Sequence, residues 1–372
     1  MNVIVAGDFC PINRPEKMLS KGDVILDDSF IQYWNSADFR IANLECPITN
    51  SAQKVTKVGP NFKVSPAIVE GLKKMNIDAF SLANNHIMDY GKEGLLETCS
   101  VLESAGLKYF GVQKGSEEFS HLLIEKDSVT VAVLGYTCAE FSLADDFENF
   151  GAYPVNIFQI VEKIEILKKK ADHIIVLLHC GLYNFAIPTP KLRELCQFLV
   201  KRGVSAVLCQ HSHVCGATEN YGDGFISYGQ GSFVFDINRK NSTWNEGYMV
   251  SLKLDKLTMH ASFRGTIQFD SDLGVGLMNV KQQLDLQRRL QTYENIIQDE
   301  SLYKEHYKET IKKMRHEYYG LMLTSNNMMR RLARYIDVGR LLPNSMKRMY
   351  LNLYRNEEHR EIIEAILKND LK

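Results

Sequence analysis

Residues 1–235 alternate short apolar runs, rich in β-branched residues, with stretches of helical period. This alternation is typical of stacked β-α units whose strands lie in a largely buried sheet. The runs expected to form strands are Val3–Ala6, Phe39–Leu44, Ala79–Ala83, Val129–Gly135, His173–Leu178, Ala206–Cys209, Phe225–Tyr228 and Gly247–Leu254, with a further β-like segment at Ser262–Phe269. The expected helices are Ala67–Met75, Gly91–Ala105, Ile157–Lys170 and Lys191–Arg202. The pattern therefore predicts a layered α/β domain.

Residues 278–372 differ in character from the rest of the chain. They hold one proline and repeated charged stretches, which favours helices. They carry 18 basic and 13 acidic side chains, a net charge of +5, so the chain's net charge of −1 leaves −6 for residues 1–277. We expect two domains, an α/β domain over 1–277 and a helical C-terminal extension over 278–372.

A basic cluster within the extension suggests a docking surface. Its cations interleave with apolar residues: Arg330, Arg331, Arg334, Arg340, Lys347 and Arg348 alternate with Met328, Met329, Leu332, Leu341, Leu342 and Met349. This pattern fits a helix that lies on a membrane surface or on a partner. It also fits a solvated basic face over a packed apolar face, and the sequence leaves both interpretations open.

The composition excludes several classes of protein. With 45% apolar and 24% charged residues, the chain resembles an ordinary globular protein rather than a disordered, collagen-like or membrane protein. The near-zero net charge gives no chain-wide field for nucleic acid. The first residues, MNVIVAGD, lack a basic leader, and eight cysteines without a CxxC pair indicate reduced thiols. We therefore expect a cytoplasmic protein, with peripheral membrane association as an option.

Potential metal ligands follow five of the apolar runs. These residues are Asp8, Glu45, the Asn84-Asn85-His86 triplet, His179, and the pair His211 and His213. All lie at the carboxyl ends of expected strands, which form the ligand-binding edge of open α/β sheets. One such residue alone is more often a turn residue or a satisfied polar group, but five strands with this ending indicate a shared site.

Oxygen and imidazole ligands are more typical of a site for Mn, Fe, Zn or Mg than of a structural zinc centre, which usually has four closely spaced Cys or His ligands. About seven ligands exceed the need of one catalytic ion that keeps an open position. They fit two divalent ions about 3.5–4 Å apart, which activate water and stabilise both the attacking and the leaving oxygen. The chemistry expected from this set is hydrolysis or group transfer.

Six motifs in order resemble the CapA family, which is named for poly-γ-glutamate capsule synthesis and is related to calcineurin-like metallophosphoesterases. The motifs are Gly7-Asp8, Asn43-Leu44-Glu45, Leu82–His86 with Asp89-Tyr90-Gly91, His179-Cys180-Gly181, His211–Val214 and Gly231–Asp236. The resemblance covers residues 1–240. It implies a metallophosphoesterase-like β-sandwich flanked by helices.

The resemblance also implies a role for each residue. Asp8 would bind the first metal ion and Glu45 would bridge both ions, while Asn85 and His179 would bind the second. His211 and His213 would each serve one ion. His86 would protonate the leaving group or stabilise the transition state. Asp89 either orients His86 or caps the helix at Gly91, and Asn84 is either a further ligand or a residue that hydrogen-bonds the backbone.

Three positions depart from the phosphoesterase pattern. Cys10 stands where a histidine ligand is usual, so it is either a soft ligand or a buried packing residue. Gln210 replaces a histidine, and Ser232 replaces an asparagine. These departures leave the inferred ligands in place and bear on metal identity and on full activity.

Two functions of different class follow from these features. The first is a di-metal hydrolase or transferase of capsule or surface-polymer synthesis, which acts on an anionic polymer or a phosphorylated glycan precursor through a phosphoester or a γ-glutamyl amide. The second is a non-catalytic scaffold that docks on a membrane-bound synthesis or export complex through residues 278–372. A nucleotide phosphohydrolase or nuclease is a third option, and the acidic charge of residues 1–277 disfavours nucleic acid as a substrate.

Overall fold

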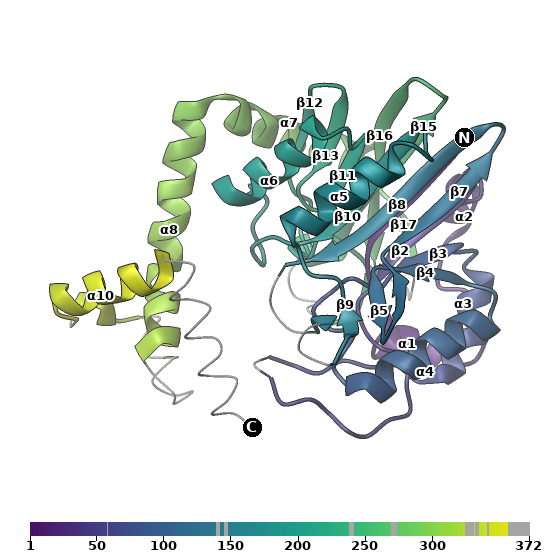
Figure 1. The fold of residues 1–372 in the computed structure, drawn as a ribbon, viewed down its shortest axis with the longest axis horizontal. Helices are drawn as coiled ribbons and strands as arrows, with labels where there is room; N and C mark the ends of the chain where they lie inside the picture. Colours follow the sequence, from purple (N-terminus) through teal and green to yellow (C-terminus); the bar gives the residue numbers. More distant parts are fainter. Residues whose placement is uncertain are drawn as a thin grey trace. The chain divides into compact units, whose positions relative to one another are not determined.

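The computed structural model describes residues 1–57, 59–138, 142–144, 148–237, 242–268, 274–323, 331, 335–340 and 342–355. The chain divides into two compact units, Met1–Gln298 and Asp299–Lys372. The first, drawn with its sheets in Figure 1, holds every strand described below. The described elements of the second are α8 (Glu300–Leu323), η4 (Val338–Arg340) and α10 (Asn344–Arg355). Of the basic cluster, residues 328–330, 332, 334 and 341 lie outside the described residues.

Two large sheets form the first unit. The eight-stranded sheet has the order β17 (Val275–Leu277), β16 (Met259–Gln268), β15 (Glu246–Leu254), β1 (Asn2–Cys10), β2 (Phe39–Leu44), β3 (Ala79–Ser81), β4 (Lys108–Phe110), with β14 (Ser232–Phe235) paired to β1. The six-stranded sheet has the order β12 (Thr218–Tyr221), β13 (Gly224–Ser227), β11 (Ala206–Gln210), β10 (His173–His179), β8 (Val129–Thr137), β7 (His121–Lys126). A small third sheet joins β6 (Glu117–Phe119), β5 (Val112–Lys114) and β9 (Phe150–Ala152).

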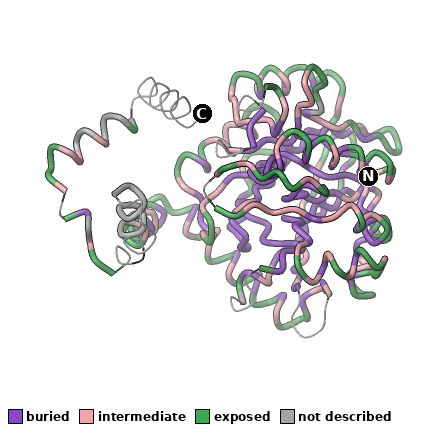
Figure 2. The backbone as a smooth tube through the Cα atoms, turned by 90° about the horizontal axis from the view of Figure 1, so that it is seen from below, coloured by how far each residue is buried: buried purple, intermediate pink, exposed green. Residues whose placement is uncertain are grey.

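The two large sheets pack face to face because β1 is apolar on both sides. Val3 and Val5 share one buried cluster with Val131 and Ile175 of the second sheet. Ile4 lies in a separate cluster on the opposite face, among the helices of the N-terminal half. Figure 2 shows the buried residues gathered in the interior of the first unit. The expected α/β sandwich flanked by helices is confirmed, since both faces of the first sheet are covered.

Helices cover the outer face of each sheet. Figure 1 shows α1 (Arg14–Leu19), α3 (Val69–Lys74) and α4 (Gly91–Ser104) on the side of β3 and β4. Of the other helical elements of this half, η1 (Pro66–Ile68) contacts α1 and α3, and α2 (Asp28–Trp34) contacts β17. The second sheet is flanked by α5 (Ile157–Leu167) and by α6 (Pro190–Lys201), which packs on β11 and β13. The remaining elements of this unit are η3 (Ser242–Asn245) and α7 (Val280–Gln298). In the part of the chain that the structure describes, no helix has the length and apolar character needed to cross a bilayer.

Helix α7 lies in the first unit, although the sequence pattern assigned its residues to the extension. Leu286 and Leu290 belong to the cluster between the sheets. The backbone N–H of Gly265 donates to the side-chain oxygen of Gln283 at 2.9 Å, and Arg289 forms an ion pair with Glu246 at 2.5 Å. The compact unit therefore ends after Gln298 rather than at residue 277, because these apolar contacts outweigh the charged composition of the helix.

The expectation of reduced thiols is wrong for one pair, since Cys138 and Cys180 form a disulfide. β8 and β10 are parallel neighbours with Thr137 opposite His179, so the residues that follow each strand end lie side by side. Their Cα atoms are 5.2 Å apart, within the usual range for a disulfide. Their sequence separation of 42 hides the pair from a search for CxxC. The other six cysteines are free and buried.

Candidate metal centre

The expected ligands come together where the parallel strands of both large sheets end. Asp8 lies near the end of β1, opposite Asn43 of β2 and Ser232 of β14. Glu45 directly follows β2, and His179 is the last residue of β10. His211 and His213 follow β11, which is parallel to β10. The carboxyl ends of four strands thus supply the side chains, as the general rule for α/β sheets predicts.

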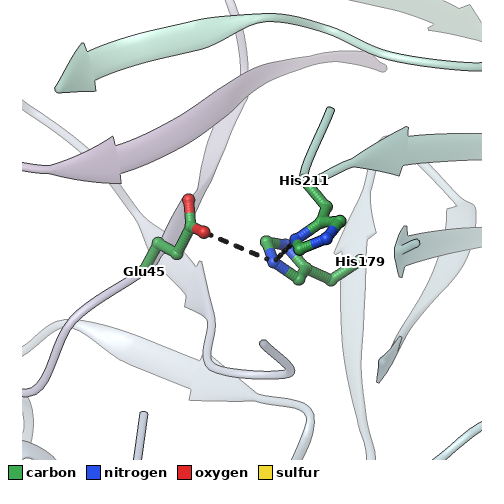
Figure 3. A group of neighbouring side chains, drawn as sticks. All are labelled: Glu45, His179 and His211. Atoms are coloured by element: carbon green, nitrogen blue, oxygen red, sulfur yellow. Dashed lines mark hydrogen bonds and ion pairs between the residues drawn. The ribbon is translucent and has the colours of Figure 1, made fainter. Parts of the chain in front are cut away.

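Figure 3 shows the first group of potential ligands, Glu45, His179 and His211. Nε2 of His179 lies 3.4 Å from Oε1 of Glu45 and 3.1 Å from Nδ1 of His211. Oδ1 of Asn85 is also 3.1 Å from Nε2 of His179. Asn85 therefore points at the same place as the three residues of the figure.

A second group consists of Asp8, Glu45 and His213. Nδ1 of His213 is 3.3 Å from Oδ2 of Asp8, and Nε2 of His213 is 3.6 Å from Oε1 of Glu45. Within each group the potential ligand atoms all lie within 4.8 Å of one another. Glu45 belongs to both groups, which is the position expected of a bridging carboxylate.

The environment of Glu45 fits a metal ligand. The side chain is buried, and among the described residues neither of its carboxylate oxygens has a hydrogen-bond partner. Burial, with the nearby charge of Asp8, raises the pKa of Glu45 to about 7. An unpartnered buried carboxylate is costly unless a cation balances it. The nitrogen and oxygen donors around it are those that divalent transition metals and Mg²⁺ accept.

Asp8 is held as an anion in the same place. Burial acts to raise its pKa, but hydrogen bonding to His213 and the charges of His213 and His179 outweigh burial and lower it to about 2. The side-chain N–H of Asn43 donates to Asp8 at 2.8 Å, and the backbone N–H of His211 donates at 3.1 Å. The ionised carboxylate therefore has a fixed orientation before any ion binds.

Both histidines of the His-x-His segment have unusual backbone conformations. His211 has φ 85° and His213 has φ 54°, in the left-handed region that non-glycine residues rarely occupy. Such conformations cost about 1–3 kcal/mol each and cluster at functional sites. Here they turn two imidazoles, separated by one residue, toward the two ligand groups.

His86 and Asp89 form a pair beside the ligands. Nδ1 of His86 lies 2.7 Å from Oδ2 of Asp89. The N-cap position of helix α4 is Tyr90, not Asp89, and no side chain caps the helix there. Asp89 instead accepts from the backbone N–H of Phe62 at 2.6 Å. Of the two roles considered for Asp89, the geometry matches the one that orients His86.

Two further candidates point elsewhere. The side-chain amide of Asn84 donates to the backbone oxygen of Leu44 at 2.7 Å, and its oxygen accepts from the backbone of His86 at 3.1 Å. This is the inward-pointing alternative. The Cys10 thiol is buried in the core, which raises its pKa well above the usual value, and it hydrogen-bonds Cys46. This burial among core residues matches the packing alternative for Cys10.

Gln210 and Ser232, the two substituted positions, contact the strand β1 and the ligand His213 respectively. Nε2 of Gln210 donates to the backbone oxygen of Ala6 at 3.3 Å, so it ties β11 of one sheet to β1 of the other. The Ser232 hydroxyl lies 3.4 Å from Nδ1 of His213. Both residues therefore support neighbouring ligands in place of the usual side chains.

Several residues of the centre were not anticipated. Asn43 contacts both Asp8 and Nδ1 of His179, the latter at 3.2 Å; its place in the Asn-Leu-Glu motif was the available signal. The ring of Trp244 lies 4.5 Å from that of His213, and Tyr183, half exposed, lies 5.6 Å from Trp244. These aromatic residues come from segments in which no motif marks them.

These observations define an α/β protein with a buried histidine and carboxylate centre of the metal-binding type, built between the ends of two sheets. Residues 2–237 match the profile of the family described as bacterial capsule synthesis protein PGA_cap, and the chain belongs to that family. The expected CapA membership is thereby confirmed.

Curated relatives carry related descriptions. The chain is 29% identical over 213 residues to the capsule biosynthesis protein CapA of Bacillus anthracis, which covers 55% of this chain and 52% of that protein. It is 28% identical over 221 residues to the PGA biosynthesis protein CapA of Bacillus subtilis, covering 56% and 57%. The match thus spans about half the length of these relatives. A solved structure of the calcineurin-like phosphoesterase YfkN from Bacillus subtilis covers 80% of this chain at 14% identity and a TM-score of 0.41.

Proposed function

We propose that this chain is a metal-dependent hydrolase or transferase that acts in the synthesis of a capsule or surface polymer. The proposal rests mainly on Glu45. This buried carboxylate belongs to both histidine-containing groups and has no hydrogen-bond partner among the described residues. The family and the names of the curated relatives support the polymer, either poly-γ-glutamate or a polysaccharide.

The residues present would hold two divalent ions, with Glu45 between them, Asp8 and His213 on one side, and His179, His211 and Asn85 on the other. When bound, such ions supply an activated water and stabilise developing charge on the substrate oxygens. Mn, Fe and Zn suit these nitrogen and oxygen donors, and Mg remains an option. The bond cleaved is a phosphoester or a γ-glutamyl amide.

The chain's own residues then perform three tasks. Asp8, ionised and held by Asn43, keeps its charge at a fixed place. His86 donates a proton to the departing oxygen or nitrogen, with Asp89 holding its Nδ1. The hydrophobic walls formed by Phe62 on His86 and by Trp244 on His213 exclude water from the imidazoles.

Turnover assays on the full-length protein test this function. The panel contains p-nitrophenyl phosphate, a phosphorylated sugar and a γ-glutamyl amide, each with Mn²⁺, Fe²⁺, Zn²⁺ or Mg²⁺. Asp8→Ala, His179→Ala and His213→Ala should each lose metal and turnover by more than the roughly 100-fold that changes outside the ligand shell cost. The exposed residues Asp223 and His260 provide matched controls, and their alanine variants should behave as wild type. Ligand variants that keep both metal and turnover would contradict this centre, whereas a wild-type protein that turns over no member of the panel would favour the non-catalytic scaffold.

The partner is proposed to be an anionic polymer or a phosphorylated glycan precursor, brought to the site by a membrane-bound synthesis complex. The net charge of +5 in residues 278–372 and the basic helix α10 support docking on an anionic surface. Lys347→Glu with Arg348→Glu in the full chain should lower sedimentation with anionic vesicles several-fold. A double variant that sediments like wild type would count against this route.

The expected place of action, in the cytoplasm at the membrane surface, stays a prediction. The disulfide between Cys138 and Cys180 argues against a permanently reducing compartment, because disulfides in such compartments are transient. Labelling of exposed lysines such as Lys73 and Lys256 in intact cells with a membrane-impermeant amine reagent would locate the chain.

A further inference from the structure

A buried lysine lies behind the pair formed by His86 and Asp89. Lys57 belongs to the segment between β2 and η1, and its side chain is 2% exposed. Its ammonium group forms an ion pair with Oδ1 of Asp89, whose side chain is 0% exposed. Nζ also lies 3.1 Å from Nδ1 of His86 and donates to the backbone oxygen of Asn85 at 3.3 Å. No motif in the sequence marks this residue.

The Asp89 carboxylate is shared between its partners. Oδ1 faces the ammonium group of Lys57, while Oδ2 lies 2.7 Å from Nδ1 of His86 and accepts from the backbone N–H of Phe62 at 2.6 Å. An ammonium group has donors alone and an ionised carboxylate has acceptors alone, so we assign the proton to Nδ1 of His86, which donates it to Oδ2. Asp89 is therefore the acceptor that connects two donors, and Lys57 fixes the oxygen that His86 does not use.

A buried ion pair of this kind adds little net stability, because desolvation of both charges offsets their attraction. The ion pair instead fixes the orientation of the Asp89 carboxylate, and the orientation of the His86 imidazole depends on that carboxylate. With Nδ1 engaged by Asp89, Nε2 is the nitrogen left to serve a substrate. Any rotation of the Asp89 carboxylate would turn the imidazole with it.

We propose that Lys57 is a positioning residue for the reaction, which holds the Asp89 carboxylate so that Nε2 of His86 faces the leaving group. This inference rests on the proposed hydrolase or transferase function. Lys57 is not needed merely to hold the segment between β2 and η1 in place, because other hydrogen bonds attach this segment. The side-chain amide of Asn61 donates to the backbone oxygens of Val55 and Asp89 at 3.1 and 3.0 Å.

Asn61 therefore supplies the matched control. Asn61→Ala removes loop hydrogen bonds without touching the Asp89 carboxylate, whereas Lys57→Met removes the ammonium group and keeps the aliphatic chain. A double variant, Lys57→Met with Asp89→Asn, removes both charges at once. It leaves no unpaired charge in this pair, so it protects the test against a single variant that fails to fold.

The first readout needs no activity. Proton and nitrogen NMR of the imidazole N–H groups should contain a downfield resonance, absent from His86→Gln, that reports the bond from Nδ1 to Asp89. This resonance should shift upfield or vanish in Lys57→Met and persist in Asn61→Ala. An unchanged resonance in folded Lys57→Met would overturn the proposal.

The second readout compares a poor leaving group, phenyl phosphate, with a good one, p-nitrophenyl phosphate. Protonation by His86 matters most for the poor leaving group. Lys57→Met should slow its kcat about 100-fold while slowing that of p-nitrophenyl phosphate less than about 10-fold. Asn61→Ala should change both esters equally, and metal content should stay at the wild-type value. Equal losses on both esters in Lys57→Met would overturn the positioning role.

A double-mutant cycle shows whether Lys57 acts through Asp89. The loss in the double variant should equal that of the worse single variant, because the two changes break the same arrangement. Multiplicative losses would overturn the proposal. If the wild-type protein cleaves neither ester nor amide, the hydrolase or transferase function fails, and the NMR comparison alone decides whether Lys57 orients His86.

Discussion

Asp8 lies near the end of β1 and Glu45 directly follows the neighbouring strand β2, yet the pKa values of the two carboxylates shift in opposite directions. Glu45 is shifted upward to about 7 by burial and by the charge of Asp8. Asp8 is also buried, but its hydrogen bond to His213 and the adjacent imidazole charges bring its pKa to about 2. The metal-free centre thus holds one fixed anion and one carboxyl group that protonates near neutral pH.

This difference predicts a pH-dependent stability of the metal-free protein. Folded Glu45 keeps its proton up to pH about 7, whereas the unfolded residue releases it near its ordinary value of 4.5. The folded state binds more protons between these values, so the free energy of unfolding falls as pH rises from 4.5 to 7. Glu45 contributes about 3 kcal/mol to this loss. Asp8 acts outside this window. Its lowered pKa stabilises the folded state above pH 3.8, and this stabilisation is lost as pH falls from 3.8 toward 2.

Urea unfolding of the chelator-treated protein from pH 4.5 to 8 measures the effect. Glu45→Gln should remove about 3 kcal/mol of the pH dependence, while the exposed Glu70→Gln should retain it. If the two variants have the same pH profile, the burial argument for Glu45 is wrong.

Much of this centre could be predicted from single residues. Strand-end positions identified Asp8, Glu45, His179, His211 and His213, because parallel strands place their carboxyl ends at one edge whatever the loops do. Lys57 and Trp244 could not be predicted, since Lys57 comes from a loop and Trp244 from the short helix η3, and the course of both segments depends on tertiary contacts. Nor could the orientation of Asn84, because adjacent side chains after a strand can point either way.

At the scale of elements, close contact between β1 and the segment before β14 positions Asp8. A Cβ added at Gly7 would lie 2.1 Å from the backbone oxygen of Gly231. Gly7→Ala should therefore destabilise the protein by about 3 kcal/mol and displace Asp8. Thermal unfolding and metal titration measure both effects.

Gly274→Ala is the control for this substitution, since its new Cβ would lie no closer than 3.4 Å to the nearest backbone atom. Equal melting temperatures and metal affinities for the two variants would show that β1 and β14 can separate without consequence.

The disulfide between Cys138 and Cys180 is a second contact between elements that lies close to the centre. It joins the segments that follow β8 and β10, next to His179, and closes a loop between cysteines with a sequence separation of 42. In the chain-entropy account such a loop contributes about 4 kcal/mol. Cys138→Ser should lower the free energy of unfolding by about 2–4 kcal/mol, whereas Cys99→Ser removes only a buried free thiol.

Thiol titration of the unfolded protein checks the pairing directly. Six free cysteines should react before reduction and eight after it. Eight reactive thiols before reduction, in protein purified without reductant, would contradict the disulfide.

The long strands could be predicted from sequence, and β2 (Phe39–Leu44) was found with the expected bounds. Their cores are runs of buried β-branched residues, a strong signal. The three-residue strands β5, β6 and β9 could not be predicted, because such short segments take their conformation from their partners. Helix α7 was expected as a helix, but its membership of the first unit depends on apolar contacts of Leu286 and Leu290 that composition does not reveal.

At the scale of the whole molecule, the family match covers residues 2–237 and so lies entirely within the first compact unit. The candidate centre lies in the same range. The second unit, Asp299–Lys372, lies outside the match. This division separates the proposed chemistry of the first unit from the proposed docking role of the extension.

Elemental analysis of the purified full-length protein tests the central claim most directly. Two ligand groups that share Glu45 predict two equivalents of a divalent metal per chain after reconstitution, and Glu45→Gln should lower both occupancies together. A value of zero after reconstitution, or full occupancy in Glu45→Gln, would contradict a centre built around this bridging carboxylate.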